Sequence, residues 1–226
     1  MSQDTSTFGI SIPDIFRSGV RGYFANPLPL SLAAAFTLGT LLAFRVPAQT
    51  AFNDGELALS LAYDMIGLIL ASIVALPWYY YALDQADGRD IDLRRPLKKP
   101  GRFGAQAVAS FWFWAGFLLG LRYLFGIPSL LALVFYAFYG FVVADSDARG
   151  LVALGTSVRI GAGKRIGLAA IAALFLLFNL LGALAVGFAV NALTIGLTLV
   201  GLIITTSITM VSGAHVYRVL EKEVEG

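Results

Sequence analysis

Few residues of this chain are of a type that does chemistry. The sequence contains no cysteine, which excludes thiol catalysis, disulfides and thiolate metal sites. Its one histidine, His215, ends a long apolar stretch, and a single histidine without cysteine cannot form a zinc site of the usual kind. The clustered carboxylates lie in polar segments with no histidine beside them to complete an acid–base pair. The residue types therefore predict a protein that is not an enzyme and has no metal site and no cofactor.

Asp64 is the acidic residue that interrupts an apolar stretch. A carboxylate inside a membrane span costs a few kcal/mol, so it is either functional, as a proton or cation site, or paired. Arg45 and Arg122 fall at the same end of their predicted spans as Asp64. We therefore expect an intramembrane ion pair of Asp64 with Arg45 or Arg122, rather than a transport site.

The basic residues gather in polar segments that flank the apolar stretches. Four to eight of them beside a span are typical of contacts with anionic lipid headgroups. A short loop offers no basic face of a folded domain, so nucleic acid is not an expected partner. The expected contacts with headgroups or with a partner subunit are Arg94, Arg95, Lys98, Lys99, Arg102, Arg159, Lys164 and Arg165.

The elements that must position these residues are transmembrane helices. The 226 residues are 58% hydrophobic and 13% charged, about half the charge of a soluble domain. The 49 uncharged residues 166–214 are too long for one crossing, because a span needs roughly 20 residues, so we expect a turn near 188–193. The fold class is therefore all-α, a polytopic integral membrane protein with six spans in three hairpins. We predict the spans at 28–44, 57–83, 103–121, 127–144, 166–187 and 193–215.

Six spans place both termini on one side of the membrane. Residues 1–27 form an interfacial segment, residues 28–216 the transmembrane domain and residues 217–226 a charged tail. All lysines and arginines except Arg45 and Arg122 then fall on the side of the termini. By the positive-inside rule this side is cytoplasmic, with Arg45–Glu56 as a short outer loop. The predicted location is the inner membrane of a bacterium.

The polar stretch 145–165 predicts a short amphipathic helix on the cytoplasmic face. Leu151, Leu154 and Val158 fall within one arc of about 100° on a helix, and they define the expected apolar face. The glycines at 161 and 163 predict the end of this helix.

This stretch also carries a family resemblance. A span that ends in Asp145 leads to a segment with Ala153 and Ser157, and then to Gly163 and Lys164 before a glycine-containing hairpin. Over about residues 125–220 this pattern resembles the YciC-type bacterial polytopic membrane proteins. It is similar to the membrane domain of some glycerophosphodiester phosphodiesterases, without their catalytic domain. The resemblance implies a multi-span inner-membrane protein of a family of largely unknown function.

The function we expect is non-enzymatic: an accessory or scaffold component of a membrane complex that contacts anionic lipid, a partner membrane protein or a second copy of the chain. A transporter or a solute- or lipid-binding membrane subunit is the alternative. The aromatic runs at 78–81, 111–114 and 135–141 favour packing, with a hydrophobic ligand pocket as the other reading. A lipid-modifying enzyme would need Asp84, Asp87, Asp90 and Asp145 to gather around Mg²⁺ at the inner surface.

Overall fold

The protein has an all-α fold of the polytopic membrane type. The computed structural model describes residues 11–123 and 125–225, with the backbone alone at residues 122, 123 and 225, and these ranges contain no strand. Six helical stretches are long and apolar enough to cross a membrane, which confirms the predicted fold class and number of spans. They are Pro27–Asn53, Leu57–Val74, Gly101–Leu121, Ile127–Asp145, Arg165–Gly182 and Ala192–Val224.

Most spans are single long helices, and the span Ile127–Asp145 is made of two shorter ones. The helices of the spans are α2 (Pro27–Asn53), α3 (Leu57–Val74), α5 (Gly101–Tyr123), the pair α6 (Ile127–Phe135) and α7 (Tyr139–Asp145), α9 (Arg165–Gly182) and α11 (Ala192–Glu225). The helices between the spans are α1 (Ile12–Ala25), α4 (Leu76–Ala86), the 3₁₀ turn η1 (Arg95–Lys98), α8 (Leu151–Ile160) and α10 (Leu184–Phe188).

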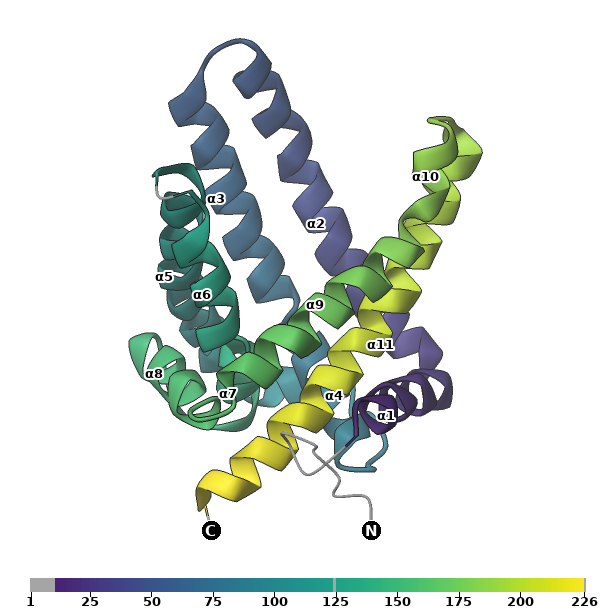
Figure 1. Cartoon of the computed structure of the whole chain (residues 1–226), viewed down its shortest axis with the longest axis vertical. Helices are drawn as coiled ribbons and strands as arrows, with labels where there is room; N and C mark the ends of the chain where they lie inside the picture. The colour runs from purple at the N-terminus through teal and green to yellow at the C-terminus, as the bar shows by residue number, and fades with distance from the viewer. Residues whose placement is uncertain (1–10, 124, 226) are drawn as a thin grey trace.

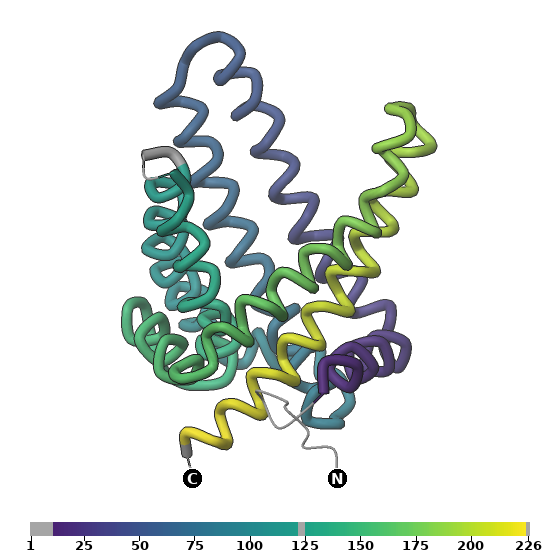
Figure 2. Tube along the Cα trace, viewed as in Figure 1, coloured from purple at the N-terminus to yellow at the C-terminus, as the bar shows by residue number. Residues whose placement is uncertain are grey.

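The hairpins spread into a V (Figure 1). The α2–α3 hairpin packs beside α5 and α6, and together they form one arm; α9, α10 and the first half of α11 form the other. The Cα trace in Figure 2 shows that both described ends of the chain lie at the closed end of the V. Within the second arm, α9 and α11 touch at Gly182 and Gly201, where the backbones are so close that a Cβ on either glycine would overlap the other helix.

The core lies at the closed end, where α1, α4, α7 and the second half of α11 cross. Leu76, Leu83 and Val142 are fully buried there, and Tyr217 is 1% exposed. The helix α1 lies across α11, and its buried residues recur at the spacing of one helix face. Gly19 on that face lies against Ser212, where any side chain would overlap the Ser212 hydroxyl. The closed end is therefore where side chains from distant segments meet.

Two of the predicted spans are broken. The stretch predicted as one span over 57–83 ends at Val74 and restarts as α4 at Leu76, because Pro77 has no N–H to continue the helix and its ring crowds the preceding turn. The stretch predicted over 127–144 opens between Phe135 and Tyr139, so that α6 and α7 are separate helices. At this second break, Ser157 of α8 hydrogen-bonds to the backbone groups that the helix leaves without partners.

Two helices continue past the predicted ends of their spans. Residues 45–53 do not form a loop, because α2 continues through Arg45 and Pro47 to Asn53. The tail does not separate at residue 217, because α11 continues to Glu225 and its residues Tyr217 and Leu220 are each 1% exposed. In both places a charged or polar residue finds partners on a neighbouring helix, so polarity alone did not mark the end of the helix.

Candidate functional site: a charged layer at the closed end of the V

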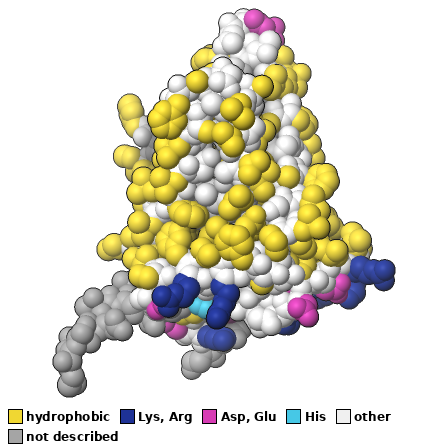
Figure 3. Space-filling model, turned by 90° about the vertical axis from the view of Figure 1, so that its right-hand side faces the viewer, with side chains coloured by type: hydrophobic (Ala, Val, Ile, Leu, Met, Phe, Trp, Pro, Cys, Tyr) yellow, Lys and Arg dark blue, Asp and Glu magenta, His cyan; other side chains and the backbone are white. Residues whose placement is uncertain are grey.

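Most of the charged residues form a layer at the closed end of the V, built from the ends of α1, α4, α5, α7, α8 and α11 and from the loops between them. The layer arises because each span is apolar inside and charged where it ends, so the ends of neighbouring spans bring charges of both signs together. Figure 3 shows the result on one face, where Lys and Arg side chains surround the histidine directly below a broad apolar surface.

Arg218 joins three helices in this layer. Its Nε donates to Asp87 Oδ1 at 2.8 Å, its Nη2 to Asp145 Oδ1 at 2.9 Å, and its Nη1 to Glu221 Oε2 at 2.7 Å. Asp87 follows α4, Asp145 ends α7, and Arg218 and Glu221 belong to α11. The Arg218 side chain is 16% exposed, so these charge-assisted bonds are largely shielded from water.

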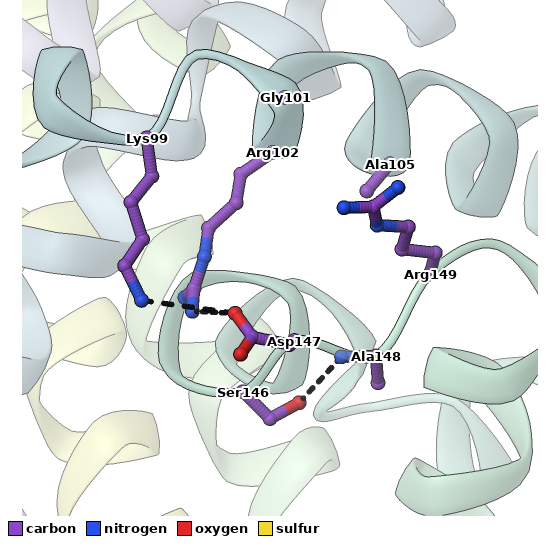
Figure 4. Close-up of a pocket in the computed structure, with 8 residues that line it drawn as sticks. All are labelled: Lys99, Gly101, Arg102, Ala105, Ser146, Asp147, Ala148 and Arg149. Carbon is purple, nitrogen blue, oxygen red and sulfur yellow. Dashed lines mark hydrogen bonds and ion pairs between the residues drawn. The ribbon is translucent and has the colours of Figure 1, made fainter.

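Arg102 caps the C-terminal end of α7. Its Nη1 donates to the backbone oxygens of Val143, at 3.1 Å, and Ala144, and its Nη2 donates to Asp147 Oδ1 at 3.0 Å. The last carbonyls of a helix have no partner within the helix, and a cation there also interacts favourably with the helix dipole. Figure 4 shows Arg102 and Lys99 converging on Asp147 in a pocket of about 270 Å³, with Arg149 on the opposite side. These two cations lower the pKa of the exposed Asp147 carboxyl, the hydrogen bond from Arg102 contributing most.

Asp84 is the most deeply buried carboxylate of the layer, at 2% exposure. It pairs with Arg95 of η1 and, at 3.2 Å, with Arg89. Burial raises the pKa of the Asp84 carboxyl above its ordinary value, and the two guanidinium groups oppose that rise. The Tyr80 ring lies under the guanidinium groups of Arg95 and Arg102, at 5.3 and 6.0 Å from its centroid. Aromatic and acidic side chains of α4 thus hold both arginines inward.

Two of the residues expected to contact headgroups or a partner are engaged within the layer. Arg95 and Arg102, whose side chains are 28% and 9% exposed, bind partners on other helices, which the sequence did not indicate. Lys98 and Lys99 are exposed but lie 2.7 Å from Asp92 and 3.7 Å from Asp147. The side chains of Arg94 and Arg159 are exposed and have no carboxylate within 4 Å among the described residues. The set thus divides into side chains held inside the layer and exposed cations.

The last two residues of the set lie at the start of α9. Lys164 Nζ is 3.2 Å from Glu223 Oε2 of α11, which ties the loop after α8 to the end of the chain. Arg165 is exposed, and its guanidinium carbon lies 3.9 Å from the centre of the Phe135 ring. Both therefore contribute to packing as well as to the surface charge.

The helix α8 lies where the sequence predicts it, but a different face packs. Ala153, Leu154, Ser157 and Ile160 are buried, whereas Leu151 is 60% exposed and Val158 is half-buried. Of the expected apolar face, only Leu154 is buried against the protein. Ser157 Oγ accepts from the Phe138 N–H at 3.1 Å and donates to the Phe135 carbonyl at 3.2 Å. It thus satisfies the open backbone between α6 and α7, which no water could reach in a membrane.

Asp64 lies beside Arg45, across the α2–α3 hairpin. Arg45 Nη1 donates to the two carboxylate oxygens at 3.0 and 3.1 Å, and the side chains of Arg45 and Asp64 are 57% and 22% exposed. The structure therefore brings together two of the three residues expected to pair. The side chain of Arg122 lies outside the described part of the chain.

A cleft between α1, α4 and α11 holds a cationic group that the sequence did not single out. Its volume is about 530 Å³, and Arg17, Arg21, Arg89 and His215 line it together with Asp14 and Asp90. Arg17 lies 3.8 Å from Asp14, while Arg21 has no carboxylate within 4 Å among the described residues. The detectable signal is the spacing of Arg17 and Arg21, because residues four apart share one helix face.

Three of the four aspartates considered for a Mg²⁺ site are paired with arginines. Asp84 binds Arg95 and Arg89, and Asp87 and Asp145 share Arg218, while Asp90 lies in the cleft. Within residues 11–123 and 125–225, no three His, Cys, Asp or Glu side chains are grouped as metal ligands. The three paired carboxylates are thus compensated by guanidinium groups.

No family model, no curated protein and no solved structure matches this chain. Its function must therefore be inferred from its own geometry.

Proposed function

We propose that the protein is a non-enzymatic membrane component, an accessory or scaffold protein, that binds anionic lipid headgroups in the cleft between α1, α4 and α11. The observation that carries the proposal is the position of this cleft. Arg17, Arg21 and Arg89 line the cleft. Phe24 and Leu28 lie close in sequence to its lining residues 25 and 26, and their side chains are 67% and 68% exposed. A phospholipid has the matching pattern, an anionic phosphate beside an apolar chain.

The charge of the cleft favours an anion. Asp14 offsets Arg17 only at 3.8 Å and in an exposed position, where an ion pair contributes about 1 kcal/mol or less. Arg21 has no such partner in the described part of the chain, so its guanidinium is available for a phosphate. Arg89 is shared with Asp84 and Asp87 and supports the site from the α4 side.

The orientation in the membrane belongs to the same proposal. All lysines and arginines except Arg45 and Arg122 belong to the segments that form the closed end of the V. The positive-inside rule then places that end, with both termini, on the cytoplasmic side, where anionic lipid attracts juxtamembrane cations. The bacterial inner membrane, and the YciC-type resemblance that suggested it, remain predictions. A solute-binding subunit is supported by a different feature, the cavity described in the next subsection.

Lipid binding by purified protein tests the proposal. In nanodiscs that contain phosphatidylglycerol and phosphatidylcholine, native mass spectrometry should detect retained phosphatidylglycerol. The Arg21→Glu variant should retain about tenfold less, since one cation near an anionic surface contributes about 1 kcal/mol and reversal also adds repulsion. The matched control is Arg94→Glu, the same change on an exposed arginine of the same layer that does not line the cleft. An equal loss in both variants would indicate diffuse surface charge and would refute a site in the cleft.

A further inference from the structure

An aromatic cavity lies inside the first arm of the V, away from the charged layer. It has a volume of about 330 Å³, within the range of small-molecule pockets. Residues of α2, α3, α4, α5 and the α6–α7 junction line it, with Met210 of α11. Six of its lining residues are aromatic: Trp78, Tyr79, Phe113, Trp114, Tyr136 and Tyr139. The three aromatic runs that stand out in the sequence therefore meet around one space.

The depth of the cavity places it within the apolar part of a membrane. Phe113 lies 12 residues after the start of α5 at Gly101, about 18 Å along the helix, and hydrocarbon is about 30 Å thick. In the part of the chain that the structure describes, no charged side chain lines the cavity. Leu133 and Ala137 of its lining are exposed, so the cavity is open to the surroundings of the spans, where a membrane would supply lipid. A molecule that enters must therefore be uncharged and dissolved in the membrane.

A serine hydroxyl fixes two of the aromatic side chains of the cavity wall. Ser72 Oγ accepts from Trp114 Nε1 at 2.9 Å and from the Tyr139 hydroxyl at 3.4 Å, and it donates to the Leu68 carbonyl at 2.8 Å. The Phe113 and Tyr139 rings are stacked, with their centroids 5.0 Å apart. The wall thus consists mainly of aromatic side chains, several of them held in place.

We propose that this cavity binds an uncharged, membrane-dissolved molecule with a planar ring, such as a quinone. The ring would stack among the aromatic side chains that line the cavity. An acyl chain matches this wall less well, because it has no flat face. The site is independent of headgroup binding, since none of the residues of the cationic cleft lines it.

Tryptophan fluorescence can test this proposal directly. The chain has three tryptophans, of which Trp78 and Trp114 line the cavity while Trp112 is 51% exposed. In a Trp112→Phe background both remaining fluorophores report on the cavity. Decylubiquinone added to this protein in phosphatidylcholine nanodiscs should quench the emission saturably, with one molecule per chain.

One variant locates the site. Ala137→Phe places a large side chain at an exposed lining position and should weaken saturable quenching at least tenfold. Circular dichroism and size-exclusion profiles identical to those of the parent protein would show that the variant is folded.

Two outcomes would overturn the proposal. Quenching that rises linearly with the quinone content of the nanodisc, and to the same extent in Ala137→Phe, would mean collision in the lipid without a site. Nanodiscs of brominated phosphatidylcholine test whether a lipid acyl chain occupies the cavity. If the bromine quenches the cavity tryptophans and decylubiquinone does not relieve that quenching, the space holds an acyl chain. Relief of bromine quenching by the quinone in the parent, but not in Ala137→Phe, is the result we expect.

Discussion

Two ion pairs at opposite ends of the spans show how differently one chain can use the same charges. Arg45 and Asp64 form a single pair between adjacent helices of one hairpin, and the Arg45 side chain is 57% exposed. Arg218 binds Asp87, Asp145 and Glu221 from three helices and is 16% exposed. The first pair lies about two turns from the α2–α3 turn, close enough to the end of the hairpin for water to screen it. The second joins helices that are distant in sequence. Breaking it would leave the partly buried Asp145 without its cation, while Asp87 would keep Arg89.

The largest effect is expected from removing Arg218. Arg218→Leu leaves Asp87 and Asp145 without their shared cation, and breaking a buried pair from one side costs about 3–5 kcal/mol. The thermal midpoint in detergent should fall well below that of the parent, and part of it should return in Arg218→Lys, which restores the charge without the bidentate fork. Arg17→Leu is the control, because its guanidinium is exposed. A midpoint within error of that control would mean that the network does not hold the closed end together.

An intermediate effect is expected at Arg102. Arg102→Met preserves the length of the side chain but leaves the carbonyls of Val143 and Ala144 without their donor, for a cost of about 1–3 kcal/mol. The same unfolding measurement should place this variant between Arg218→Leu and the parent. Lys99→Met is the matched control from the same pocket, since Lys99 is exposed and 3.7 Å from Asp147. Equal stability of the two variants would contradict the proposed role of Arg102 in closing α7.

The smallest effect is expected at the outer pair. Arg45→Gln should lower stability by about 1 kcal/mol or less, because the arginine is largely exposed. A double-mutant cycle with Asp64→Asn measures the pair itself, and we expect a coupling energy of a few tenths of a kcal/mol. A coupling as large as the effect of Arg218→Leu would show that the outer pair is as important as the inner network, and the contrast between the two ends would no longer hold.

The sequence predicts the spans better than the side-chain partners. The number of spans and the turn before Ala192 follow from hydrophobic length. The break at Pro77 was detectable in the sequence but was missed, whereas the break after Phe135 has no local signal, since it depends on Ser157 of α8. Arg95 and Arg102 read as surface cations because their partners, Asp84 and the end of α7, are contributed by other helices. The cleft at Arg21 was missed for the same reason.

What the sequence by itself determines here is the membrane class, the six apolar spans and the gathering of cations at one end, because these follow from the length of apolar runs and from where charges interrupt them. The tertiary structure decides which arginines are held inside the charged layer and which are exposed, which face of α8 packs, and that three separate aromatic runs line one cavity. These depend on side chains that are far apart along the chain, and hydropathy records nothing about which helix lies beside which.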